Sequence, residues 1–229
     1  MDEPKVVHRV HHSWLAVTEK ALMLRIAARL PQAVTPDGLT GFGLLGAGIT
    51  GLGFVGTWYW PPSMLVALVG LVMSWLGDSL DGNTARLRGI ERPTYGFFID
   101  HNVDIMAQVL IFIGLGLSPY MHFASACLCL LAYWLASLYT FIRAVSVGVF
   151  QISYFGVGPT EIRLALALYC LAMYLAGNPQ HDFGFGRLAL IDAFSVALFA
   201  GVFGLYLRMV WVESRRLDQL DRGRRDRTA

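Results

Sequence analysis

Six apolar stretches alternate along the chain with short polar turns. They cover residues 39–60, 63–86, 96–118, 123–147, 159–177 and 185–210. A helix needs about 20 mainly apolar residues to cross the hydrocarbon core of a bilayer, and each stretch is close to that length. The pattern therefore predicts an all-α integral membrane protein with six transmembrane helices.

A shorter helix is predicted ahead of the first span, over residues 13–31, where Pro31 ends it. Its polar residues Thr18, Arg25 and Arg29 lie on one stripe between apolar neighbours. We interpret it as an amphipathic helix at the membrane interface; a packing helix of a soluble domain is the alternative. The expected organisation is an N-terminal cytosolic or interfacial segment (1–34), a six-helix transmembrane domain (35–212) and a basic cytosolic tail (213–229).

The composition supports the membrane prediction. Hydrophobic residues make up 55% of the chain and charged residues only 15%, with a mean hydropathy of +0.53. The net charge of +2 shows no basic excess, so no nucleic-acid partner is expected. The three cysteines lie in apolar stretches without metal-binding spacing, so we interpret them as small apolar side chains.

Four aspartates stand out because they lie at the ends of two neighbouring apolar stretches. Asp78 and Asp81 are spaced i, i+3, and Asp100 and Asp104 are spaced i, i+4, so each pair shares one helix face. Carboxylates at this depth repel one another and are expensive without a counter-charge. A bound cation relieves the repulsion, and an oxygen-only ligand set favours magnesium, manganese or calcium over zinc.

Small residues and a cation lie beside the first aspartate pair. Gly82 and Ala85 allow a ligand to approach the helix backbone closely. Arg86 carries a permanent charge on a planar fork suited to phosphate. Together with metal-binding carboxylates, these residues indicate a site for a metal-bound diphosphate.

This stretch resembles the signature of the CDP-alcohol phosphotransferases, or CDP-alcohol phosphatidyltransferases, which are integral membrane enzymes of phospholipid synthesis. Their pattern is D-x-x-D-G-x-x-A-R, a spacer, and G-x-x-x-D-x-x-x-D. The chain matches it at Asp78, Asp81, Gly82, Ala85, Arg86, Gly96, Asp100 and Asp104. The spacer is one residue longer than usual, but the extra residue falls in a predicted turn, where insertion is tolerated.

The resemblance implies a metal-dependent enzyme that transfers a substituted phosphate from a CDP-linked donor to a small alcohol and releases CMP. It implies that Asp78, Asp81 and Asp100 are metal ligands, and that Asp104 is a ligand, the general base, or both. The substrate-binding positions implied by the likeness are Gly82, Ala85, Arg86 and Gly96. It also implies two Mg²⁺ or Mn²⁺ ions, contact with membrane lipids, and a homodimer, which we expect in a bacterial or archaeal cytoplasmic membrane.

Three further charged residues could take part in substrate binding. Arg143 ends the fourth stretch, and Glu161 and Arg163 begin the fifth, at the level of the aspartates. Each could line the substrate cavity or make a structural ion pair. His101 lies between the second pair of aspartates, where we expect it to point elsewhere on the helix and serve a structural role.

A turn precedes the first span at Thr35 to Thr40. In the family that the signature resembles, a P-N-x-x-T element often lies at this place. Pro36 and Thr40 are similar to it, while Asp37 replaces the asparagine. An ordinary turn and helix cap is the alternative interpretation.

The basic residues predict the orientation of the spans. They lie before the first span, in the loop after the second, and after the last; the turns on the other side contain neither lysine nor arginine, with only Arg187 near them. The positive-inside rule therefore predicts that both termini and all four aspartates face the cytosol. Two other functions are weighed against a phosphotransferase: an intramembrane prenyltransferase and a divalent-cation transporter. The acceptor alcohol and the kind of CDP donor stay open.

Overall fold

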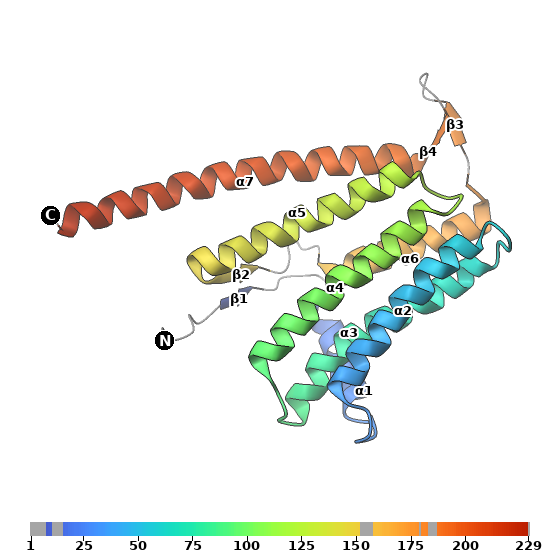
Figure 1. Cartoon of the computed structure of the whole chain (residues 1–229), viewed down its shortest axis with the longest axis horizontal. Helices are drawn as coiled ribbons and strands as arrows, with labels where there is room; N and C mark the ends of the chain where they lie inside the picture. The colour runs from blue at the N-terminus through green and yellow to red at the C-terminus, as the bar shows by residue number, and fades with distance from the viewer. Residues whose placement is uncertain (1–7, 11–15, 152–157, 179, 183–186, 229) are drawn as a thin grey trace.

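The computed structural model describes the chain except for residues 1–7, 11–15, 152–157, 179, 183–186 and 229. In the described part, seven helices account for nearly all the regular structure (Figure 1). They are α1 (Ala16–Ala27), α2 (Pro36–Gly56), α3 (Ser63–Leu87), α4 (Pro93–Gly116), α5 (Phe123–Val147), α6 (Pro159–Ala176) and α7 (Leu190–Thr228). Four strands of three residues each are β1 (His8–Val10), β2 (Val149–Gln151), β3 (Gln180–Asp182) and β4 (Arg187–Ala189).

Helices α2 to α7 are long and apolar enough to cross a membrane, which confirms six spans and an all-α multi-pass membrane protein. The boundaries differ from those expected by a few residues. α2 and α4 begin three residues earlier because Pro36 and Pro93 occupy their first turns. The last span begins at Leu190 rather than at 185, and its helix continues without a break to Thr228.

The short strands were not predicted. β1 pairs in parallel with β2, which brings residues 8–10 against the segment that follows α5. β3 and β4 pair in antiparallel fashion between α6 and α7. Three-residue strands carry too little periodicity to be distinguished from turns in the sequence.

Glycines bring α2 and α3 into close contact. A Cβ atom at Gly46 would lie 2.5 Å from the backbone nitrogen of Ser74, and one at Gly53 would lie 2.5 Å from that of Ala67. No side chain fits at these distances, so the two helix backbones can approach only because these positions are glycine. Gly41 and Gly48, by contrast, face open space.

Helix α1 packs against the beginning of α2 and the end of α3 (Figure 1). Met23 and Ala27 of α1 are buried with Leu39 and Leu80 in a small apolar cluster. Arg88 joins the same region: its guanidinium donates to backbone carbonyls in the turn between α1 and α2, including that of Val34 at 2.6 Å. These contacts support the end of α3 that carries Asp78 and Asp81.

Helices α5 and α7 lie side by side, next to the group formed by α2, α3, α4 and α6 (Figure 1). An edge-to-face contact between Tyr139 and Tyr206, with ring centroids 6.2 Å apart, is part of their interface. The main apolar core lies between α2, α3, α4 and their neighbours, where Phe54 and Met64 are fully buried. A large cavity remains between the two groups of helices.

Candidate active site

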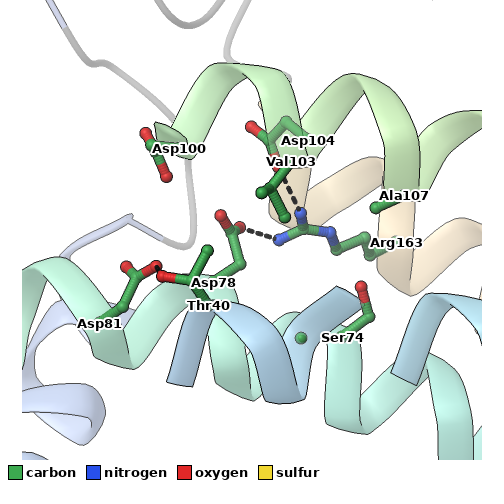
Figure 2. Close-up of a pocket in the computed structure, with 10 residues that line it drawn as sticks. Thr40, Ser74, Asp78, Asp81, Asp100, Val103, Asp104, Ala107 and Arg163 are labelled. Carbon is green, nitrogen blue, oxygen red and sulfur yellow. Dashed lines mark hydrogen bonds and ion pairs between the residues drawn. The ribbon is translucent and has the colours of Figure 1, made fainter. Parts of the chain in front are cut away.

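The four aspartates meet in one pocket. Asp78 and Asp81 come from the C-terminal half of α3, and Asp100 and Asp104 come from the N-terminal half of α4. The turn between these helices is short, and the two aspartate pairs face each other across the pocket (Figure 2). The helical spacing predicted in the sequence is therefore realised on two facing helices.

Arg163 of α6 reaches into this pocket between the two pairs (Figure 2). Its Nη1 lies 2.5 Å from an oxygen of Asp78, and its Nη2 lies 3.6 Å from an oxygen of Asp104. Its side chain is only 19% exposed. Arg163 was expected either to line the substrate cavity or to make a structural ion pair. In the structure it lines the small pocket and pairs with Asp78 and Asp104, so it compensates part of the charge of the aspartates.

Asp81 is held by its neighbours on α2 and α3. The hydroxyl of Thr40 donates to one carboxylate oxygen at 2.6 Å, and the backbone N–H of Gly82 donates to the other at 2.5 Å. Thr40 thus belongs to the site, although the sequence alone left a plain helix cap as the alternative. The signal that pointed to it was the spacing from Pro36 to Thr40.

The neighbouring Asp37 contacts the turn between α3 and α4. Its carboxylate accepts a hydrogen bond from Arg92, whose guanidinium also lies over the ring of Tyr95, 4.2 Å from the centroid. The Asp37 carboxylate raises the pKa of the Arg92 guanidinium above its ordinary value. This exposed pair connects the beginning of α2 to the beginning of α4 beside the pocket.

His101 has the local contacts expected of a structural residue. Its Nδ1 lies 2.8 Å from the carbonyl oxygen of Phe97 and 3.6 Å from a carboxylate oxygen of Asp100. Its ring also packs against Phe97 and Phe141, with centroids 4.3 and 5.1 Å away. The residue nevertheless forms part of the wall of the large cavity.

The large cavity has a volume of about 1920 Å³ and shares all four aspartates with the smaller pocket. The other expected substrate-binding residues that line it are Gly82, Ala85, Arg86, Gly96 and Glu161. Deeper in the cavity its walls are apolar and aromatic, with contributions from α4, α5, α6 and α7. Its volume exceeds the roughly 300–1,000 Å³ of ordinary ligand pockets, which is room for a lipid-sized molecule.

Gly82 has a specific relation to Arg86. The Arg86 guanidinium folds back along α3 and donates to the side chain of Asn83 at 3.1 Å. A Cβ atom at Gly82 would lie 3.3 Å from Nη2 of Arg86, closer than an ordinary contact. At Gly96, in contrast, a Cβ atom would meet nothing within 4 Å. The absence of a side chain at Gly82 therefore leaves space for the guanidinium.

The structure separates the three other charged candidates. Glu161 lines the large cavity, while one of its oxygens accepts from the backbone N–H of Gly158 at 2.9 Å and so caps α6. Arg143 lies 3.8 Å from Glu213 of α7 and is not among the described residues that line either cavity. Arg143 therefore makes the structural ion pair that was one of its two expected roles.

Glu19 of α1 was not singled out in the sequence. It accepts hydrogen bonds from the indole N–H of Trp75 at 2.9 Å, the hydroxyl of Ser79 at 2.8 Å and the hydroxyl of Thr160 at 2.6 Å. Ser79 follows Asp78 in α3, and Thr160 begins the turn of α6 that leads to Arg163. An acidic residue in a helix otherwise assigned to the interface was the signal that could have identified it.

Among the described residues, no three or more histidine, cysteine, aspartate or glutamate side chains form a group that could bind an ion. Arg163 faces Asp78 and Asp104, while Thr40 and Gly82 donate hydrogen bonds to Asp81. The metal site expected from the sequence stays a prediction.

The fold and pocket define a multi-pass membrane protein with a carboxylate-rich pocket that opens on a large, mainly apolar cavity. The family model for CDP-alcohol phosphatidyltransferase matches residues 33–209, and the chain belongs to this family. No curated protein sequence matches the chain. Family membership supports a membrane-bound transferase of phospholipid biosynthesis that acts on a CDP-alcohol and an alcohol.

Proposed function

We propose that the protein is a metal-dependent phosphotransferase that works at the cytosolic face of the membrane. It moves a substituted phosphate from a CDP-linked donor to the hydroxyl of a second alcohol and releases CMP. The proposal rests mainly on the convergence of Asp78, Asp81, Asp100 and Asp104 in one pocket. The same four aspartates also line a cavity large enough for a lipid. The match over most of the chain to the phosphatidyltransferase family supports this function over a prenyltransferase or an ion transporter.

The four carboxylates fit Mg²⁺ or Mn²⁺ in donor chemistry, because they offer only hard oxygen ligands. Asp78, Asp81 and Asp100 are proposed to hold the ions, with Asp104 as a further ligand. When bound, two such ions would neutralise the diphosphate and the developing charge on the leaving CMP. Thr40 supports this role because it orients Asp81 through a 2.6 Å hydrogen bond.

Asp104 is proposed to accept the proton of the acceptor hydroxyl. It lies one helical turn beyond Asp100 on α4 and lines the large cavity. As the acceptor oxygen forms its bond to phosphorus, the bond from phosphorus to the CMP oxygen breaks, CMP leaves with the electron pair, and Asp104 takes the hydroxyl proton. A carboxylate at this place can therefore act where a lipid-linked phosphate and an alcohol meet.

Gly82, Ala85, Arg86 and Gly96 are proposed to bind the CMP part of the donor. They line the same end of the large cavity as the aspartates. The planar fork of Arg86 can donate two parallel hydrogen bonds to phosphate oxygens. The apolar remainder of the cavity suits the lipid chains of whichever substrate is membrane-bound.

The orientation proposed here follows from the basic residues, which lie on the side of both termini and of the aspartates. This side gives the pocket access to soluble nucleotide-linked substrates. A homodimer in a bacterial or archaeal membrane is likewise proposed from the family likeness. Glu161, which lines the cavity, would suit a cationic amino alcohol, whereas Arg163 would suit a phosphorylated acceptor.

The test is release of CMP by the purified protein in detergent, with CDP-diacylglycerol and CDP-linked headgroups as donors and a panel of alcohols as acceptors. One donor and acceptor pair should release CMP, chelation should abolish the release, and Mg²⁺ or Mn²⁺ should restore it. Asp81→Asn should lose the activity, while Asp221→Asn, which changes an exposed carboxylate of α7, should keep it. Release that persists in chelator, or in Asp81→Asn, would contradict the proposal.

A further inference from the structure

Arg163 is paired with two of the four carboxylates that are proposed to bind metal. Its guanidinium stands between Asp78 and Asp104, at 2.5 and 3.6 Å from their oxygens (Figure 2). The free volume left in this pocket is about 10 Å³, which is about what a single water molecule requires. All four aspartates also line the large cavity, so an ion that approaches from that side meets Asp78 and Asp104 already paired with the guanidinium.

The guanidinium is presented from a firmly held helix end. The hydroxyl of Thr160 donates to Glu19 of α1, and the carboxylate of Glu161 caps the first turn of α6 at Gly158. Arg163 follows within the next residues and is only 19% exposed. The packing of α6 against α1 and α3 therefore determines the position of the Arg163 side chain.

From these observations we infer that Arg163 is an internal cation that competes with the metal for the aspartates. In the metal-free protein it compensates the charge of Asp78 and Asp104, and metal loading requires its displacement from them. This inference rests on the proposed metal-dependent function. It assigns Arg163 a positioning role: the residue keeps the carboxylates from repelling one another until an ion replaces it.

The competition should change the affinity of the protein for metal by a measurable factor. A hydrogen bond to a charged group corresponds to about 10–100-fold in an equilibrium constant. Metal binding to the wild-type protein is weakened by this factor, because the bond to Asp78 must break first. Removing the guanidinium should therefore tighten metal binding, whereas loss of an ordinary structural or phosphate-binding residue would leave it unchanged or weaken it.

The test is titration of the full-length protein in detergent with Mn²⁺ alone, with free Mn²⁺ followed by electron paramagnetic resonance. Arg163→Met should bind Mn²⁺ about 10–100-fold more tightly than the wild type, and Arg163→Lys should fall between them. Arg143→Met is the matched control, because it removes the same charge from a residue paired with Glu213 instead; its affinity should equal that of the wild type.

Thermal unfolding provides a second reading that does not depend on turnover. Arg163→Met should unfold at a lower temperature than the wild type in chelator and should gain more from added Mn²⁺. If the wild type binds Mn²⁺ and Arg163→Met binds it no more tightly, the inference is wrong while the proposed function stands. If the wild type binds no Mn²⁺, the metal-dependent function and the inference both fail.

Discussion

Glu19 is expected to hold α1 against the ends of α3 and α6 beside the aspartates, and replacing it with alanine tests this. The substitution removes three hydrogen bonds that reach two different helices, from Trp75 and Ser79 of α3 and from Thr160 of α6. It also leaves these three donors, all in partly buried bonds, without their acceptor. The apolar contacts of Met23 and Ala27 with α3 remain.

The expected loss can be worked from these contacts. A hydrogen bond to a charged acceptor contributes roughly 1.5–3 kcal/mol, so three such bonds set an upper limit of roughly 5–9 kcal/mol. Water can replace part of this because the site is only partly buried, and bonds to one carboxylate are not additive. We therefore expect Glu19→Ala to lower the free energy of unfolding by about 2–4 kcal/mol, and Glu19→Gln, which keeps an acceptor, by about 1–2 kcal/mol.

The assay is thermal unfolding of the purified protein in detergent, followed by the helical signal in circular dichroism. For a chain of this size, 1 kcal/mol corresponds to about 2–4 °C, so Glu19→Ala should unfold about 4–16 °C below the wild type. Lys20→Gln is the control, because Lys20 is the exposed neighbour on the same helix. If both variants unfold at the same temperature, the three hydrogen bonds do not hold α1 in place and the reasoning is refuted.

Two predictions concern the chemistry. Asp104→Asn should leave donor binding largely intact and reduce turnover by about 10²–10⁴-fold, the contribution of a general base, whereas Asp81→Asn should weaken donor binding itself. Titration of donor binding, together with single-turnover rates, separates the two effects. Equal losses of donor binding in both variants would show that Asp104 is chiefly a metal ligand. Gly82→Ala should raise the KM for the CDP donor, because the new Cβ would lie 3.3 Å from the Arg86 guanidinium. Gly96→Ala is the control and should leave the KM unchanged, because its Cβ would have no neighbour within 4 Å. Steady-state kinetics of both variants checks this, and an unchanged KM in Gly82→Ala would count against a role for Arg86 in donor binding.

Much of the architecture could be predicted from the sequence. Within the bilayer each backbone polar group must find its partner in the same helix, so an apolar run of about 20 residues has few options other than a span. The four aspartates were identifiable for a similar reason. Charged residues within a membrane span are energetically unfavourable, so those that occur usually have a functional role. The spacings from Asp78 to Asp81 and from Asp100 to Asp104 place each pair on one helix face.

The partners of these aspartates depended on the tertiary structure. Helical periodicity determines which residues share a face, but it does not determine which distant helix lies against that face. Thr40 reaches Asp81 across 41 positions of the chain, and Arg163 reaches Asp78 across 85. Both contacts exist because glycines bring α2 close to α3 and because α6 packs against the same end of α3.

The three charged residues beyond the aspartates show the same contrast between what the sequence and what the tertiary structure determine. Arg143, Glu161 and Arg163 were equivalent in the sequence, since each lies at the end of a span at the level of the aspartates. The packing of α5 against α7 turns Arg143 toward Glu213, while the fixed first turn of α6 directs Arg163 into the pocket. The sequence by itself determined which charges reach this depth of the membrane. The packing of the helices decided which charges meet, because the electrostatic energy of an ion pair depends on a distance that only the assembled helices define.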